Sequence, residues 1–311
     1  MTVSFIYYSS FIIHHSTLKM TFFFIFFLCY PLAALPLAVL YLLLPVVYVV
    51  VNHVVRYRRK VVDDNLLRSF PELTVKERRR IRNRYYWHLS QIAIEMIKML
   101  LIPRWALRYR YHCDDKSLPE KFFNEGRSVI LMSSHYNNWE WMIVALDEMF
   151  PQHGIGVGKA NSDKVFEKWV NRARTRRGTE VCFADTVREV FAHYEGEHIP
   201  TAYMMLADQS PGNPKKCYVT KFLNQTTGVI YGPEYFARKY DIPVLYYEVV
   251  KERIGKYRVD IQLITEHPND EEPYAITQKY TELLERTIRR KPEYWIWSHR
   301  RWKLKQLEVR G

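Results

Sequence analysis

An uncharged stretch from Met20 to Val55 constrains the fold of this chain more than any other feature of its sequence. It contains no Asp, Glu, Lys or Arg and is far longer than the roughly 20 apolar residues that cross a bilayer. We therefore expect an N-terminal hydrophobic membrane-anchor helix within residues 20–55, rather than a buried helix of a globular domain. Pro31, Pro36 and Pro45 are expected to kink or divide it. One tilted span followed by an interfacial helix is as consistent with the sequence as one straight helix.

Basic residues on the two sides of this stretch predict its orientation. The segment "RYRRK", residues 56–60, follows it directly, whereas Lys19 is the nearest cation before it. The positive-inside bias then places everything after Arg56 in the cytoplasm. No small-residue cleavage site stands out before a polar region, which favours an uncleaved anchor. Met20 would also serve as a start codon, which leaves open whether residues 1–19 belong to the protein.

The chain is strongly basic, with a formal net charge of +13. Such an excess indicates an anionic partner: nucleic acid, a phospholipid surface, or an acidic protein or substrate. A predicted helix that opens with a capping box at Thr74 and Glu77 carries much of this charge in its first part, between Lys76 and Arg84. Close behind an anchor, these cations are placed to bind anionic headgroups, and a plain solvated face is the alternative.

Neither the cysteines nor the glycines form a metal or cofactor motif. Cys29, Cys113, Cys182 and Cys217 are far apart, without a CxxC pair or a Cys/His cluster at zinc spacing, so we expect reduced structural thiols. The segment "GIGVGKA" (154–160) resembles a phosphate-binding loop. It lacks the first glycine of the Walker pattern and the Ser or Thr that follows the lysine. The sequence therefore predicts neither a metal nor a nucleotide cofactor.

Beyond about Leu118, short apolar runs alternate with amphipathic segments. Residues 127–134, "RSVILMSS", are typical of a buried strand and precede a predicted helix from Asn138 to about Phe150. This alternation continues to the helical pattern "AITQKYTELLERTIRRK" near the C-terminus. It predicts an α/β fold with a central mixed, partly parallel sheet flanked by helices. No clear linker interrupts it, so we expect one cytoplasmic α/β domain over residues 56–311 behind the anchor.

His135 and Glu140 are candidate catalytic residues in the turn that leaves the first predicted strand. A separation of five on one helix would put the side chains about 140° apart. A histidine in the turn and a glutamate in the first helical turn could still meet, because the histidine can fold back. An imidazole oriented by a carboxylate suits a general base. In the alternative interpretation, Asn137 is the N-cap and Glu140 its partner in a variant capping box.

The segment "ADQSPG" (207–212) follows another predicted strand. The carboxyl ends of strands in an α/β sheet line the ligand crevice, so Asp208 and Gln209 are candidate ligand contacts. A plain turn, initiated by the aspartate, is the alternative.

Two basic clusters are further candidates for contact with an anionic ligand. The segment "NRARTRRG" (171–178) includes Arg174, and arginine is suited to bidentate binding of phosphate; exposed helix charge is the alternative. The segment "PEYWIWSHRRWK" (292–303) interleaves tryptophans with cations, among them Arg300. This tail suits a membrane interface or a nucleic-acid face, and equally a C-terminal segment packed back onto the domain.

Taken together, these features resemble a known family. The N-terminal anchor, "SSHYNNWE" with its H-x4-E spacing, "ADQSPG" and the tail are similar to those of the bacterial lipid A biosynthesis acyltransferases. These are late (lauroyl or myristoyl) transferases of the lysophospholipid acyltransferase superfamily, and the likeness extends from about Phe22 to Lys303. The resemblance implies an α/β sheet with flanking helices, tethered to the inner face of the cytoplasmic membrane. It also implies transfer of an acyl chain from acyl carrier protein to a hydroxyl of a lipid A precursor.

The resemblance implies roles for individual residues as well. His135 would be the general base and Glu140 its orienting acid, while Asp208, Gln209 and Arg300 would line the site. The acceptor hydroxyl would attack the thioester directly, with no acyl-enzyme and no metal or other cofactor. The implied partners are acyl carrier protein, an anionic acceptor lipid and membrane phospholipid, and not nucleic acid.

The sequence departs from the family at Lys159-Ala160-Asn161, where these enzymes usually show an Arg-Pro-Asn-like stretch. Lys159 is a candidate to replace the arginine and to stabilise the oxyanion, and Asn161 is a candidate substrate contact. The departure leaves the acceptor open, so an acyltransferase for another lyso-lipid (a glycerophospholipid, ornithine lipid or glycolipid) is the alternative. A non-catalytic membrane-anchored protein that binds lipid or nucleic acid is a candidate from a different class.

Overall fold

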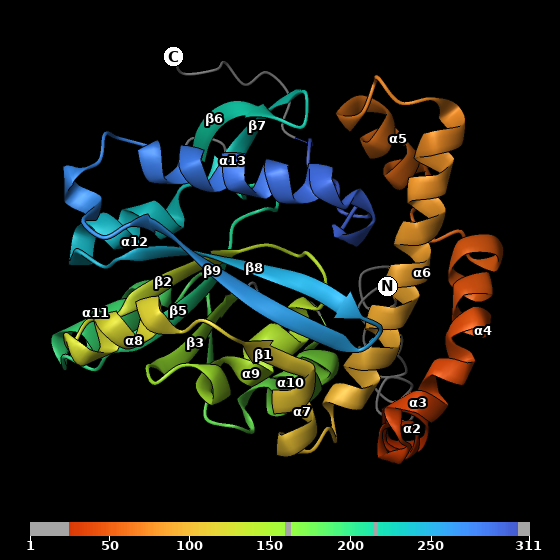
Figure 1. Cartoon of the computed structure of the whole chain (residues 1–311), viewed down its shortest axis with the longest axis horizontal. Helices are drawn as coiled ribbons and strands as arrows, with labels where there is room; N and C mark the ends of the chain where they lie inside the picture. The colour runs from red at the N-terminus through yellow and green to blue at the C-terminus, as the bar shows by residue number, and fades with distance from the viewer. Residues whose placement is uncertain (1–24, 159–162, 214–216, 304–311) are drawn as a thin grey trace, which may run out of the picture.

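The chain forms an α/β body with an apolar helical segment beside it (Figure 1). The computed structural model describes residues 25–158, 163–213 and 217–303. Within these residues, the body contains a seven-stranded sheet of order β1-β9-β8-β2-β5-β3-β4. Its strands are β1 (Tyr111–Cys113), β2 (Val129–Ser133), β3 (His153–Gly158), β4 (Glu180–Phe183), β5 (Thr201–Leu206), β8 (Val244–Arg253) and β9 (Lys256–Thr265).

Most neighbouring strands of this sheet run parallel. Strand β2 pairs in parallel with β5 and β8, β3 with β4 and β5, and β1 with β9. Strands β8 and β9 pair antiparallel. Strand β2, with the sequence VILMS, is buried along its whole length, as expected for a parallel strand covered on both faces. The predicted mixed, partly parallel sheet flanked by helices is therefore confirmed.

Helices cover both faces of the sheet, as the alternating pattern predicted. One face packs against α8 (Ser117–Asn124), α9 (Trp139–Met149) and α10 (Lys164–Thr175), and the other against α11 (Val187–Gly196), α12 (Gly232–Tyr240) and α13 (Ala275–Arg290). Because side chains alternate along a strand, Val129 and Leu131 of β2 enter the first cluster, while Ile130 and Met132 enter the second.

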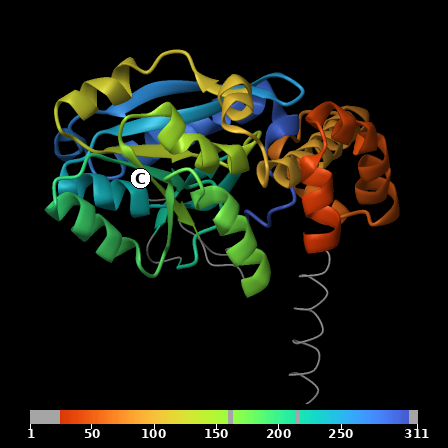
Figure 2. The same cartoon turned by 90° about the horizontal axis from the view of Figure 1, so that it is seen from below.

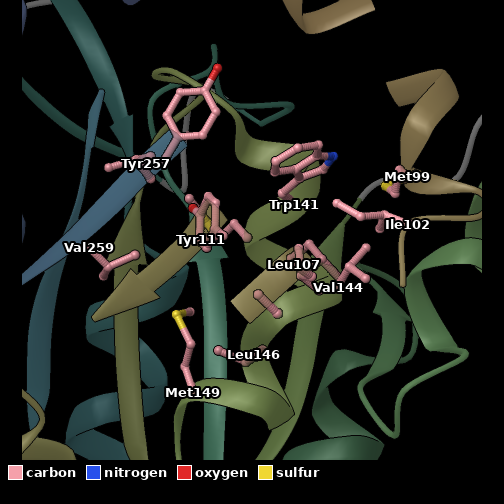
Figure 3. Packing of buried hydrophobic residues seen from close by; sticks show 14 of the residues in the cluster. Met99, Ile102, Leu107, Tyr111, Trp141, Val144, Leu146, Met149, Tyr257 and Val259 are labelled. Carbon is pink, nitrogen blue, oxygen red and sulfur yellow. The ribbon is translucent and has the colours of Figure 1, made fainter. Parts of the chain in front are cut away.

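Figure 3 shows part of the first cluster from close by. Trp141, Val144 and Leu146 of α9 lie there among the buried residues of the cluster, together with Tyr111 of β1 and Tyr257 of β9. These large side chains fix α9 against the sheet, so the start of this helix is held in place by close packing.

The apolar N-terminal segment is a run of short helical pieces rather than one straight helix. In chain order these are η1 (Ile25–Cys29), α2 (Tyr30–Ala34), α3 (Leu37–Leu40), η2 (Tyr41–Leu43), α4 (Leu44–Tyr48) and η3 (Val49–Val54). The break between α2 and α3 falls at Leu35, whose ψ is 150°. Pro36 imposes this conformation, because a residue before proline avoids the helical region. The prediction that prolines divide the stretch is confirmed at this point.

The part of this segment from Leu37 to Val54 is a candidate membrane anchor by length and composition. Its 18 residues have a mean hydropathy of 2.2, and 22% of them are buried. Leu42, Val46 and Val54 are 76%, 61% and 70% exposed. The segment lies beside the α/β body (Figure 2) and packs along α6 (Val75–Met99). An apolar outer face of this kind is what a lipid-facing helix would present.

Three helices lead from the apolar segment into the α/β body: α5 (Arg59–Ser69), α6 and α7 (Arg104–Arg110). Helix α6 begins at the capping box predicted from the sequence. Thr74 N donates to the Glu77 carboxylate at 2.8 Å, and Glu77 N donates to the Thr74 hydroxyl at 3.3 Å. The box satisfies main-chain donors that the first turn of a helix leaves unpaired.

Shorter elements complete the fold. Strands β6 (Cys217–Phe222) and β7 (Gln225–Ile230) form an antiparallel hairpin beside α13, and η5 (Pro268–Asp270) precedes that helix. The turn η6 (Pro292–Tyr294) then brings the C-terminal tail against α6. Each of the chain's cysteines is buried, and none of them takes part in a disulfide among the described residues.

Candidate active site

His135 lies in the turn between β2 and α9, as the sequence predicted. Asn137 makes this turn possible with a φ of 56°, a left-handed conformation that asparagine tolerates better than most residues. Its side-chain amide donates to the Val249 carbonyl at 2.7 Å. Asn138, rather than Asn137, is the N-cap of α9, since its side-chain oxygen accepts from Trp141 N at 2.9 Å. The cap therefore falls one residue later than the alternative interpretation expected, and Glu140 is not its capping-box partner.

The imidazole of His135 is paired with Asp208, which follows β5. His135 Nδ1 lies 2.8 Å from Asp208 Oδ1, and His135 N donates to Asp208 Oδ2 at 3.0 Å. Trp295 Nε1 donates to the same Oδ2 at 2.9 Å. Strands β2 and β5 are parallel neighbours, so the residues that follow them meet at one edge of the sheet.

Asp208 is ionised and buried, with an exposure of 2%. Burial raises the pKa of its carboxyl, but the charge of His135 and the hydrogen bonds from His135 and Trp295 outweigh burial and hold the pKa below its ordinary value. An ionised carboxylate only accepts hydrogen bonds. It follows that Nδ1 of His135 carries a proton, and that Nε2 is an acceptor whenever the ring is neutral.

The free nitrogen of His135 faces Gln209. The Gln209 side-chain nitrogen lies 3.1 Å from His135 Nε2, and because Nε2 is an acceptor, the amide donates to it. The His135 side chain is 19% exposed. The structure thus brings together three residues that the sequence singled out separately: His135, Asp208 and Gln209.

Glu140 binds Arg174 instead of His135, which corrects the contact expected from the H-x4-E spacing. Arg174 Nε donates to Oε2 of Glu140 at 3.0 Å, and Arg174 Nη2 donates to Oε1 at 2.9 Å. Glu140 is in the first turn of α9, and α10, which carries Arg174, packs against that helix. The bidentate geometry satisfies both carboxylate oxygens. Arg174 is therefore engaged by protein in the structure, and its expected contact with a phosphate would have to compete with Glu140.

The C-terminal tail packs back onto the domain, which was one of the interpretations left open by its sequence. Trp295 and Trp297 are 1% and 0% exposed. Arg301 is 2% exposed and donates to Thr227 Oγ1 and the Gly228 carbonyl, each at 2.7 Å. Arg300, the residue expected to line the site, is exposed.

The tail also adds residues to the site that sequence reasoning did not select. His299 Nε2 accepts a hydrogen bond from Ser210 N at 3.2 Å. This hydrogen bond ties the loop that follows β5 to the C-terminal tail. Burial lowers the pKa of His299 to about 4 and that of Arg301 to about 10. The interleaving of tryptophan, histidine and arginine in the tail was the available signal, but it did not indicate which side chains point inwards.

The remaining expectations for the site concern Lys159 and Asn161, which lie outside the described residues. Among the residues that the structure does describe, no group of three or more His, Cys, Asp or Glu side chains could hold a metal ion.

Comparison with known proteins agrees with the resemblance seen in the sequence. The sequence model of the bacterial lipid A biosynthesis acyltransferase family matches residues 10–304. A search of curated proteins found no match.

Proposed function

Because this chain belongs to the bacterial lipid A biosynthesis acyltransferase family, and is thus an acyltransferase of lipid A biosynthesis, we propose that His135 is the general base of its reaction. The donor in this proposal is an acyl chain on acyl carrier protein, and the acceptor is a hydroxyl of an anionic lipid A precursor. The observation that supports it most directly is the contact of 2.8 Å between His135 Nδ1 and Asp208 Oδ1.

In the proposed reaction the proton of the acceptor hydroxyl passes to His135 Nε2. The hydroxyl oxygen bonds to the thioester carbonyl carbon at the same time. The carbon–sulfur bond of the tetrahedral intermediate then breaks, and the imidazolium returns its proton to the leaving thiolate. Asp208 keeps Nδ1 protonated and offsets the positive charge that the ring gains. For the hydroxyl to reach Nε2, Gln209 has to move from its resting position.

Glu140 enters this proposal through Arg174 rather than through His135. The ion pair joins the first turn of α9 to α10, and α10 begins at Lys164, shortly after the segment with Lys159 and Asn161. We assign Glu140 a positioning role, with Lys159 stabilising the oxyanion and Asn161, Arg174 and Arg300 contacting the acceptor.

Membrane association is suggested by the apolar helix and by the family. We propose that residues 20–55 anchor the protein in the inner membrane and that the domain of residues 56–311 faces the cytoplasm. The basic segment of residues 56–60 supports this orientation. The net charge of +13 would attract both the anionic lipid and an acidic carrier protein.

The experiment that tests the function uses His135→Ala in an assay with an acyl carrier protein thioester and a lipid A precursor. We expect kcat to fall by on the order of 10²- to 10⁴-fold. His267→Ala removes a histidine whose side chain is 60% exposed and serves as the matched control. Full activity of the His135 variant would refute the base assignment, and an inactive unaltered protein would refute the donor or the acceptor.

One observation favours a second acceptor class. Lys159-Ala160-Asn161 departs from the pattern that the family usually shows, and this segment adjoins the helix that carries Arg174. A different lyso-lipid acceptor, such as a glycerophospholipid, ornithine lipid or glycolipid, would use the same base. Mass spectrometry of lipid extracts with and without the gene separates the two: an unchanged lipid A acylation pattern would favour the second class.

A further inference from the structure

We propose that Glu95 is a positioning residue of the active site, which fixes the side-chain amide of Asn138 and thereby the turn that carries His135. Glu95 is on α6, outside the β-α units that supply the site. The inference rests on the proposed role of His135, and it concerns a carboxylate that takes no part in the reaction steps described above.

Glu95 is fully buried, with an exposure of 0%. Its carboxylate accepts hydrogen bonds from Tyr41 at 2.6 Å, Gln91 at 2.8 Å, Asn138 at 2.6 Å and Tyr257 at 2.8 Å. These donors come from η2, from α6 itself, from the turn before α9 and from β9. Glu95 therefore joins the apolar segment, the sheet and the active-site turn at one buried point.

The hydrogen bonds to Glu95 counter the cost of its burial. Burial raises the pKa of Glu95 above its ordinary value, and the hydrogen bonds from Tyr41, Gln91 and Tyr257 act in the opposite direction. The side-chain nitrogens of Gln91 and Asn138 can only donate, and Glu95 is the acceptor in all four contacts. A buried carboxyl group is costly unless its hydrogen bonds are satisfied in this way.

Asn138 links Glu95 to the turn that carries His135. Its Nδ2 donates to Glu95 Oε2, so its Oδ1 is free to cap α9 by accepting from Trp141 N at 2.9 Å. Trp141 Nε1 also donates to the main-chain carbonyl of Glu95 at 3.0 Å. Glu95 therefore holds the first turn of α9 by both its side chain and its backbone, three residues after His135.

The pairing explains why the cap of α9 is an asparagine. Asp and Asn are equally good N-caps in general, so a cap alone would accept either residue. Beside Glu95, an aspartate would place two carboxylates in contact. The side-chain nitrogen of Asn138 instead donates to Glu95, and its side-chain oxygen accepts from Trp141 N. The choice of Asn138 over Asp is therefore a consequence of Glu95.

A reciprocal exchange of the two side chains tests this inference. Glu95→Gln removes an acceptor, and Asn138→Asp places a second carboxylate at the contact. In the double variant the amide at position 95 donates to the carboxylate at position 138, which still caps Trp141 N. We expect kcat to fall about 10- to 100-fold in each single variant and to recover most of that loss in the double variant.

The control is Glu282→Gln, which removes an exposed carboxylate that accepts from Gln278 at 3.0 Å. It should leave kcat unchanged. The inference is overturned if both single variants keep full kcat. It is also overturned if the double variant shows a cooperative melting transition, and is therefore folded, but is no more active than the less active single variant.

A second readout separates this inference from the proposed function. The rate of His135 carbethoxylation by diethyl pyrocarbonate, followed by peptide mass spectrometry, reports the position and environment of the imidazole ring. This measurement does not require acyl transfer. We expect the rate of carbethoxylation to change several-fold in each single variant and to return in the double variant. If the unaltered protein is inactive with acyl carrier protein thioester, the proposed function fails. The role of Glu95 is tested independently of that result, because an unchanged rate of His135 carbethoxylation in all variants would overturn it.

Discussion

The imidazole of His135 and the carboxylate of Asp208 are in contact at 2.8 Å, although 73 positions separate them in the chain. Trp295 Nε1 donates to the same carboxylate at 2.9 Å. The contact therefore fixes both the tautomer and the direction of the ring, because Asp208 holds Nδ1 and the other nitrogen faces Gln209.

Asp208→Asn should lower kcat by on the order of 10²- to 10⁴-fold, since an amide neither holds the proton on Nδ1 nor offsets the charge of the imidazolium. KM should change little, because the carboxylate is buried behind the ring. Steady-state rates with an acyl carrier protein thioester measure both. If Asp208→Asn keeps its activity and Glu140→Gln loses it, Glu140 rather than Asp208 orients the imidazole of His135.

The Glu140–Arg174 ion pair should show a coupling energy in a double-mutant cycle. The Glu140 and Arg174 side chains are 7% and 26% exposed, and their bidentate contact joins α9 to α10. Glu140→Gln and Arg174→Gln should each destabilise the protein, and the cycle should give a coupling of about 1–3 kcal/mol. Chemical denaturation measures it, and additive effects of the two substitutions would contradict the contact.

Stability should decrease as the pH falls from about 6.5 towards 4. Burial lowers the pKa of His299 from 6.5 to about 4, so between these values the unfolded chain binds a proton that the folded protein excludes. Buried His88 acts in the same direction, because burial lowers its pKa as well. Thermal unfolding across this range should show a shallower pH dependence for His299→Gln than for the unaltered protein. Identical slopes would refute the burial of a neutral imidazole at this position.

Gln209→Ala should expose the reactive nitrogen of His135. The Gln209 amide lies 3.1 Å from Nε2 in the structure and shields it from electrophiles. We expect carbethoxylation of His135 to become several-fold faster, as measured by peptide mass spectrometry. Gln262→Ala, which alters an exposed residue of β9, is the control and should not change the rate. A slower reaction in the Gln209 variant would mean that the amide holds the ring accessible rather than covered.

Charge reversal in the first turns of α6 should weaken binding to anionic membranes. Arg79 and Arg80 are exposed there, and each cation near an anionic surface contributes about 1 kcal/mol. Arg79→Glu with Arg80→Glu should therefore lower binding to anionic vesicles by about 30-fold or more, with little change for neutral vesicles. Arg188→Glu with Lys239→Glu, on α11 and α12, is the matched control in a flotation assay. Equal losses in both pairs would show a response to net charge alone.

Local patterns in the sequence were sufficient for the fold. The alternation of apolar runs and amphipathic segments predicted the sheet and its helices, because burial on one or both faces imposes a period on the sequence. The capping box at Thr74 and Glu77 and the division of the apolar stretch before Pro36 were predicted for the same reason: each depends on residues that are close in the chain.

Composition and local spacing were therefore enough to predict the fold class, the apolar segment and the loops that carry the candidate site. The pairing of side chains within the site depends on tertiary packing and could not be read from local spacing. Glu140 is the acidic residue nearest to His135 in the sequence. Parallel pairing of β2 with β5 nevertheless brings Asp208 to the imidazole. Glu140 binds Arg174 instead, because α10 packs on α9. Which side chain is buried likewise depends on neighbours that are distant in the chain.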